Sequence, residues 1–178
     1  PFSAADDYGV QTGMATFTLD MDALDRRYGL AVDPEARDPL ILDLPMPFNG
    51  DRAAFDEQLI DDMSQHPWAN LPVSMTLQVT DARGQTGQSE PQTISLPGRR
   101  FFQPIAKAVI EQRRDLLWAR SNAPRVAQIL RAVSWRPEDA FPSQTLYLRL
   151  RVAIRRLEAG LDVTPLSVER QEEIAAAL

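Results

Sequence analysis

Hydrophobic and polar residues alternate along several short stretches in the first half of the chain. Residues 14–19 place Ala15, Phe17 and Leu19 on one face, which is the two-residue period of a half-buried strand. The stretch 55–63 fits a strand or a helix, and we favour a strand because its neighbours are strands. The same clean alternation recurs in later stretches, namely 40–44, 73–80 and 93–96.

Turn signals separate these stretches and indicate how the strands are connected. Asp81–Gly84 has aspartate at its first position and glycine at its fourth, the preference of a type I turn. Asp6–Gly9 has the same arrangement. Short strands with such turns favour an antiparallel β-sandwich. Residues 20–38 form a polar insertion, in which we expect one helical turn around residues 22–27.

The second half changes to a helical period and predicts four helices. The first covers residues 104–119, with Pro104 in its first turn. Ser121 or Asn122 caps the second, Ser143 caps the third, and the Thr-Pro pair at 164–165 opens the fourth. The third helix carries one apolar stripe, made of Leu146, Leu150, Ala153, Ile154 and Leu157.

These patterns predict an α+β chain with two domains, an antiparallel β-sandwich over residues 1–97 and a small antiparallel helical module over residues 98–178. The charge changes at the same boundary. Residues 1–97 hold 16 acidic and 5 basic residues, a net charge of −11, whereas residues 98–178 have a net charge of +5. Either the two modules face each other with opposite potentials, or the basic module meets an anionic lipid surface or partner.

One arginine interrupts the apolar face of the first predicted helix. On a helical wheel, Arg113 falls in the middle of that face and Arg114 near its edge. A buried unpaired charge is very costly, so we expect Arg113 to be buried and bonded to a carboxylate or to backbone carbonyls, and Arg114 to be more exposed. Rolling of the helix to bring Arg113 to solvent is the alternative. The apolar face comprises Phe102, Ile105, Ala106, Val109, Ile110, Leu116 and Leu117.

Composition excludes several classes of site. The chain has no cysteine, so disulfides, thiolate nucleophiles and cysteine-based metal sites are excluded. No apolar run is long enough for a membrane span. The chain begins without a methionine and ends inside a helical pattern, so we expect it to be a segment of a longer protein.

Few residues are candidates for chemistry. His66 is the only histidine and precedes a proline, so we interpret it as a turn residue rather than a catalytic base. Asp6–Asp7 and Asp61–Asp62 are paired carboxylates that could bind Ca²⁺ if loops bring Asp6, Asp7 and Asp81 to one end of the sandwich, but capping of turns is favoured. The glycine-rich stretch 84–87 lacks the lysine and the following helix of a phosphate loop.

Other side chains are candidates for binding surfaces. Arg149, Arg151, Arg155 and Arg156 form one arginine-rich flank of the third predicted helix, either solvated or an interaction surface. A platform for a sugar or peptide would need an exposed aromatic, and the tryptophans Trp68, Trp118 and Trp135 are the candidates, with burial favoured for each. We therefore predict no catalytic, cofactor-binding or metal-binding residue, no cofactor and no nucleic-acid partner, because the basic half has no nucleic-acid-binding motif.

Several motifs, taken in order, resemble a proteobacterial membrane-protein family known as a domain of unknown function. They are residues 5–10 (ADDYGV), 66–72 (HPWANLP), 81–87 (DARGQTG), 96–102 (LPGRRFF) and 111–114 (EQRR). The resemblance implies membrane spans before Pro1, a long helical and then low-complexity region after Leu178, and a position on the periplasmic side of the cytoplasmic membrane. It brings no catalytic residues. The first half is also similar to bacterial immunoglobulin-like modules, whose strands end in such Asp-x-x-Gly turns.

Three kinds of function remain open. We favour a non-catalytic, extracytoplasmic interaction or scaffolding segment of a membrane-anchored envelope protein, with a protein partner or the regions of its own chain outside this segment as the binding partner. A hydrolase acting on an envelope polymer through two carboxylates is the alternative, since glycoside hydrolysis needs neither histidine nor cysteine. A sugar- or peptide-binding module is the third possibility.

Overall fold

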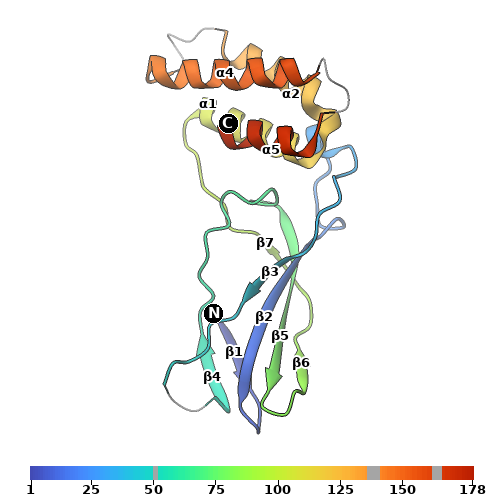
Figure 1. The fold of residues 1–178 in the computed structure, drawn as a ribbon, viewed down its shortest axis with the longest axis vertical. Helices are drawn as coiled ribbons and strands as arrows, with labels where there is room; N and C mark the ends of the chain where they lie inside the picture. Colours follow the sequence, from blue (N-terminus) through green and yellow to red (C-terminus); the bar gives the residue numbers. More distant parts are fainter. Residues whose placement is uncertain (50–51, 136–140, 162–165) are drawn as a thin grey trace. The chain divides into compact units, whose positions relative to one another are not determined.

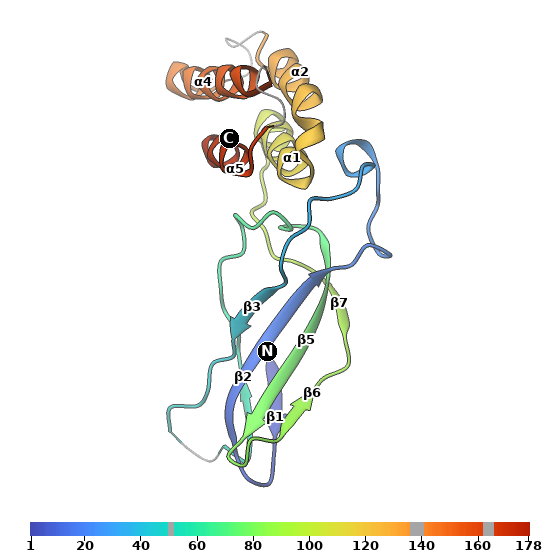
Figure 2. The same ribbon diagram turned by 45° about the vertical axis from the view of Figure 1, so that its right-hand side comes forward.

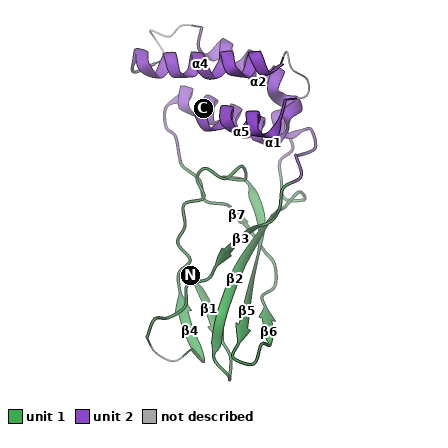
Figure 3. Ribbon diagram, viewed as in Figure 1, with its two compact units in different colours: residues 1–24, 37–99 green, residues 25–36, 100–178 purple. Residues whose placement is uncertain are grey.

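The computed structural model describes residues 1–49, 52–135, 141–161 and 166–178. The chain divides into two compact units, coloured separately in Figure 3. The first, which we call the β unit, comprises residues 1–24 and 37–99. The second, the helical unit, comprises residues 25–36 and 100–178. The polar insertion therefore contributes residues 25–36 to the helical unit.

The β unit is built from antiparallel strands in two sheets (Figure 1). One sheet pairs β1 with β4. The other has the order β3-β2-β5, and both β6 and β7 pair with β5. The strands are β1 (Phe2–Ala5), β2 (Val10–Leu19), β3 (Leu40–Asp43), β4 (Ala54–Glu57), β5 (Pro72–Asp81), β6 (Thr86–Gln88) and β7 (Gln92–Ser95).

The two long strands β2 and β5 form the centre of the larger sheet and lie side by side in Figure 2. Their register pairs Ala15 with Leu77 and Phe17 with Met75. Ala15 and Phe17 are buried, which confirms the predicted alternation in β2. In β5, Val73 is buried, but residues 74–80 are half-buried on both faces. The α+β class, with an antiparallel sandwich followed by helices, is confirmed as well.

Some local predictions in this half were wrong. The strand expected over residues 55–63 ends at Glu57, and the rest of that stretch has no regular structure. The helical turn of the insertion is a 3-10 turn at Tyr28–Leu30 instead of residues 22–27. Strands β1 and β6 were not predicted, because β1 is only four residues long and all three residues of β6 are exposed and carry no hydrophobic alternation.

Both predicted turns are present. The N–H of Gly84 donates to the carbonyl of Asp81 at 3.2 Å, and that of Gly9 donates to the carbonyl of Asp6 at 3.1 Å. Each glycine has a positive φ, +80° at Gly84 and +77° at Gly9, a conformation that costs glycine little.

The helical unit packs four helices of the described residues around one core. Helix α1 contacts α2 and α5, and α4 contacts the same two helices. The core is the cluster Leu116, Leu117, Ala123, Val126, Ala127, Leu130, Leu150, Ile154, Leu157, Leu166, Ile174 and Ala175. The helices are α1 (Pro104–Trp118), α2 (Ala123–Val133), α4 (Gln144–Leu161) and α5 (Val168–Ala177), with a 3-10 turn η2 (Arg120–Asn122) before α2.

Helix starts were predicted with mixed success. Ser143 caps α4 as expected, since its Oγ accepts the N–H of Leu146 at 3.3 Å. Asn122 occupies the N-cap of α2 but makes no side-chain cap bond. The predicted start of the fourth helix, at residues 164–165, lies outside the described residues. Helix α5 starts at Val168, and Ser167 is its N-cap.

The described helices include none with the length and hydrophobicity needed to cross a bilayer.

Candidate functional site

His66 lies in a turn and is engaged in local contacts. Its Nδ1 accepts the backbone N–H of Trp68 at 3.1 Å, and its ring meets the indole of Trp68 edge-on with ring centres 5.0 Å apart. Burial, with a smaller contribution from the positive charge of Arg37, lowers the pKa of His66. The side chain is therefore a neutral turn residue with its Nδ1 lone pair already occupied.

The acidic pairs bond to their own turns. Asp6 accepts the N–H of Tyr8 at 2.8 Å, and Asp62 accepts that of Ser64 at 2.9 Å. Oδ1 of the buried Asp81 accepts two backbone N–H groups of its turn, at 2.8 and 2.7 Å. These are the turn-capping contacts expected of aspartate. Within the described residues, no group of three or more histidine, aspartate or glutamate side chains could hold a metal ion.

Two carboxyl groups of the β unit show a shift opposite to that of a general acid. A hydrogen bond from the Thr93 hydroxyl is the main cause that lowers the pKa of Asp20, and hydrogen bonds from Ser64 lower the pKa of Asp62. A catalytic acid at neutral pH needs a raised pKa. These groups are thus stabilised as carboxylates.

The three tryptophans have different environments. Trp68 and Trp118 are buried, at 6% and 4% exposure. Trp135, which follows α2, is 82% exposed, so its predicted burial was wrong. It lies two residues beyond Val133, the last residue of α2, where no further helical turn covers it.

A buried carboxylate lies at the centre of a polar network in the helical unit. Asp115 of α1 is 2% exposed. Its Oδ1 accepts a bond from Arg114 at 3.1 Å, and its Oδ2 accepts one from Arg125 of α2 at 3.0 Å. The buried amide of Asn122 donates to the carbonyls of Gly29 and Asp115, at 2.7 and 2.8 Å. Two arginines thus compensate the buried charge, as a buried carboxylate requires.

The same region fastens residues 25–36 to the helices. The indole N–H of Trp118 donates to the carbonyl of Val32 at 2.8 Å. Arg120 forms a two-pronged bond with Glu35, at 3.0 and 3.1 Å. A Cβ at Gly29 would lie 2.1 Å from the Asp115 carboxylate, so only glycine allows this approach. The network is structural, because its polar atoms bond to one another.

Arg113 is half-buried and meets one of its two expected kinds of partner. Its Nε donates to the backbone carbonyl of Ala175 at 2.9 Å, near the C-terminus of α5. Burial lowers its pKa. Arg114 is also half-buried rather than clearly more exposed, because Asp115 holds it. Phe102, placed on the same apolar face by the wheel, is 87% exposed because α1 begins only at Pro104.

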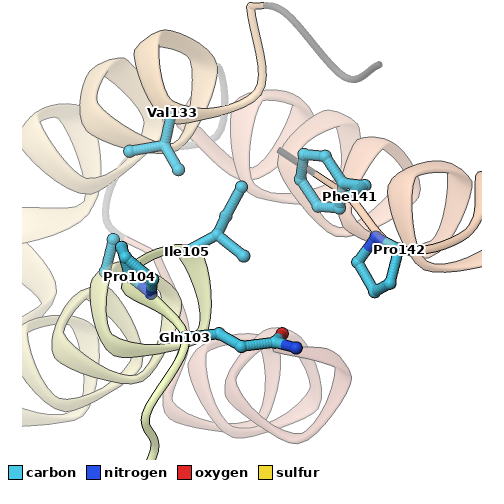
Figure 4. Close-up of a pocket in the computed structure, with 7 residues that line it drawn as sticks. Gln103, Pro104, Ile105, Val133, Phe141 and Pro142 are labelled. Atoms are coloured by element: carbon cyan, nitrogen blue, oxygen red, sulfur yellow. The ribbon is translucent and has the colours of Figure 1, made fainter. Parts of the chain in front are cut away.

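The helical unit has an apolar groove beside the first turns of α1. It consists of two adjacent cavities of about 630 and 280 Å³ that share Gln103, Ile105, Phe141 and Pro142. In Figure 4, the side chain of Ile105 lies between Val133 and Phe141. The further lining residues are Pro104, Ala106, Ala108, Val109, Leu146, Arg149, Leu150, Ala177 and Leu178.

The sequence matches one family model, a domain of unknown function (DUF4175), over residues 1–178. The chain belongs to the DUF4175 family. No curated protein and no solved structure matches it.

The described lining of the groove in this DUF4175 chain is mainly apolar. Among its described residues, the polar side chains are Gln103 and Arg149. Sequence patterns did not reveal the groove, because Ile105 and Val109 share the helical period of core residues.

Proposed function

We propose that this segment is a non-catalytic interaction module, and that the groove beside α1 binds an amphipathic helix of a partner protein. The support is the groove itself, apolar and lined by Ile105, Val133 and Phe141. An apolar groove between helices is the form that receives the apolar face of a partner helix. Its combined volume lies in the range of ligand-binding clefts.

The surroundings of the groove strengthen this proposal. Leu146, which lines the groove, is 46% exposed. Two aromatic residues next to groove-lining helices in the sequence, Phe102 before α1 and Trp135 after α2, are more than four-fifths exposed. Exposed aromatic side chains are enriched where proteins bind each other. Within the described residues, the groove lining includes no acidic side chain, so this lining gives no support to a carboxylate-dependent hydrolase.

For the cellular setting, we propose the periplasmic side of the cytoplasmic membrane, with anchoring by segments outside this chain. The support is the resemblance of motifs such as residues 66–72 and 96–102 to membrane proteins. We also propose that the β unit is related to immunoglobulin-like modules. Its described residues form seven strands, the number in a constant-type domain, although they are divided two and five instead of four and three.

The test is site-specific photo-crosslinking in native membranes. A photoreactive residue at the exposed Gln103 should yield a discrete protein adduct. Ala108→Arg, which places a long charged side chain in the groove, should abolish it. The matched control is Ala132→Arg, the same change at an exposed position of α2 outside the groove lining. An adduct that persists in Ala108→Arg, or that is lost equally in both variants, would refute the groove as the binding site.

A further inference from the structure

Helix α4 carries a second surface, directed away from the core. Its buried residues are Leu150, Ala153, Ile154 and Leu157. The opposite side, which we call the basic ridge, follows the four- and three-residue spacing of one helix face. Two large apolar residues on it, Leu148 and Val152, are 53% and 50% exposed. The basic ridge consists of Leu148, Arg151, Val152, Arg155, Arg156 and Ala159.

The positive charge of the basic ridge is largely uncompensated. Among the residues that the structure describes, Arg151 and Arg155 form no ion pair. Arg156 contacts Glu173 at 3.3 Å, but Arg170 contacts the same carboxylate at 3.0 Å. Glu158, the acidic residue of α4, is bonded to Arg131 of α2. Within the described residues, the exposed pair Leu148 and Val152 is therefore flanked by two arginines, Arg151 and Arg155, that have no acidic partner.

We propose that the basic ridge docks α4 on an anionic lipid surface. Helices that lie in a bilayer interface combine exposed apolar side chains with arginine or lysine on the flanks. Leu148 and Val152 would enter the headgroup region, while the guanidinium groups bond lipid phosphates, for which their planar fork is suited. This inference goes beyond the proposed function, because no residue of the basic ridge lines the groove.

The arrangement favours a lipid surface over a partner helix. In a packed helix pair, the stripe of Leu148, Val152, Arg155 and Ala159 would form the central seam. Arg155 interrupts that seam, and a guanidinium between two packed helices would need a dedicated partner. At a lipid surface, the same side chain extends along the apolar layer and reaches a phosphate.

The experiment is cosedimentation of the 178-residue chain with vesicles. Vesicles of phosphatidylcholine mixed with phosphatidylglycerol should retain the chain, and pure phosphatidylcholine vesicles should not. Raising the ionic strength should weaken binding, because salt screens the attraction. Each arginine near an anionic surface contributes about fivefold to binding, so the double variant Arg151→Gln/Arg155→Gln should lose about 25-fold.

The matched control removes the same charge from the β unit, through Arg83→Gln/Arg99→Gln. This control should bind nearly as wild type. Leu148→Ser should weaken binding while keeping its salt dependence. Circular dichroism checks that each variant keeps its helices. Equal losses in the two double variants would overturn the proposal. A chain that stays in the supernatant with both vesicles would also overturn it, and would assign the basic ridge to an acidic protein.

Discussion

The two units of this protein fill their interiors in different ways. In the helical unit, Leu116, Leu130 and Leu157 are completely buried in one cluster. In the β unit, a cavity of about 360 Å³ remains, lined by residues from both sheets such as Phe2, Met75 and Leu77. The larger sheet has five strands, and the sheet that pairs β1 with β4 has two. Alternation along a strand thus predicts which side faces inward, but not whether enough structure covers that side.

The largest expected effect contrasts one leucine from each interior. Leu130→Ala should lower the free energy of unfolding by about 3 kcal/mol, because it leaves a cavity in a filled core. Leu77→Ala should cost about 1 kcal/mol, because Leu77 already borders a cavity and is partly exposed. Urea unfolding followed by circular dichroism and by tryptophan fluorescence measures both. Equal losses of unfolding free energy in the two variants would show that Leu77 is as closely packed as Leu130.

Substitutions at two glycines, one closely packed and one with room for a methyl group beside it, test the same contrast. Gly29→Ala should cost about 2 kcal/mol through overpacking, because the added methyl group would overlap the Asp115 carboxylate at 2.1 Å. Gly87→Ala in β6 should be nearly neutral, since its new contact with Val79 would be an ordinary 3.7 Å. Thermal unfolding compares them. A neutral Gly29→Ala would mean that residues 25–36 shift without cost.

Two arginines extend the comparison to charged side chains. Arg113→Ala should cost about 1–2 kcal/mol, because the bond to the carbonyl of Ala175 satisfies the last turn of α5. Arg83→Ala should cost about 0.5 kcal/mol, the worth of an exposed cation–π contact, here 3.8 Å from the Tyr8 ring centre. Amide exchange of α5 offers a local measurement. If amide exchange in α5 is unchanged in Arg113→Ala, Arg113 does not cap the C-terminus of α5.

The sequence predicted the elements whose pattern is set by local periodicity. The alternation around Phe17 and the stripe around Ile154 each describe one inward face. Ala15 and Phe17 are buried, as are Leu150, Ala153, Ile154 and Leu157, whereas Leu146 at the start of the stripe is 46% exposed. Periodicity could not predict contacts between residues that are far apart in the sequence. Gly29 and Asp115 are far apart in sequence, yet their approach explains why residues 25–36 belong to the helical unit.

The candidate site was less predictable than the fold. Ile105 and Val133 have the spacing of core residues, and only the three-dimensional packing leaves them beside a cavity. The exposed Trp135 shows the same limit, since a tryptophan is buried or exposed according to what covers it. By contrast, the arginines of α4 were recognisable from their spacing alone. The sequence could not tell that Leu148 and Val152 are exposed among them.

The smallest expected effect concerns acid stability in the β unit. The Thr93 hydroxyl donates to Asp20 and lowers the pKa of Asp20 below its usual value of 3.8. A group with a lowered pKa in the folded state stabilises the fold above its unfolded pKa, and this stabilisation is lost as the pH falls through the folded value. Thr93→Val removes the hydroxyl, so the loss of stability between about pH 5 and pH 3 should become shallower.

Urea midpoints of the β unit across that pH range measure the slope. Thr93→Ser, which keeps the hydroxyl, is the matched control and should retain the wild-type slope. Because Asp20 lies at the surface, the change should also shrink at high salt, where exposed charges are screened. A Thr93→Val variant with the full wild-type slope would place the acid sensitivity of the β unit elsewhere. Asp62, whose pKa is lowered mainly by Ser64, would then be the next carboxylate to test.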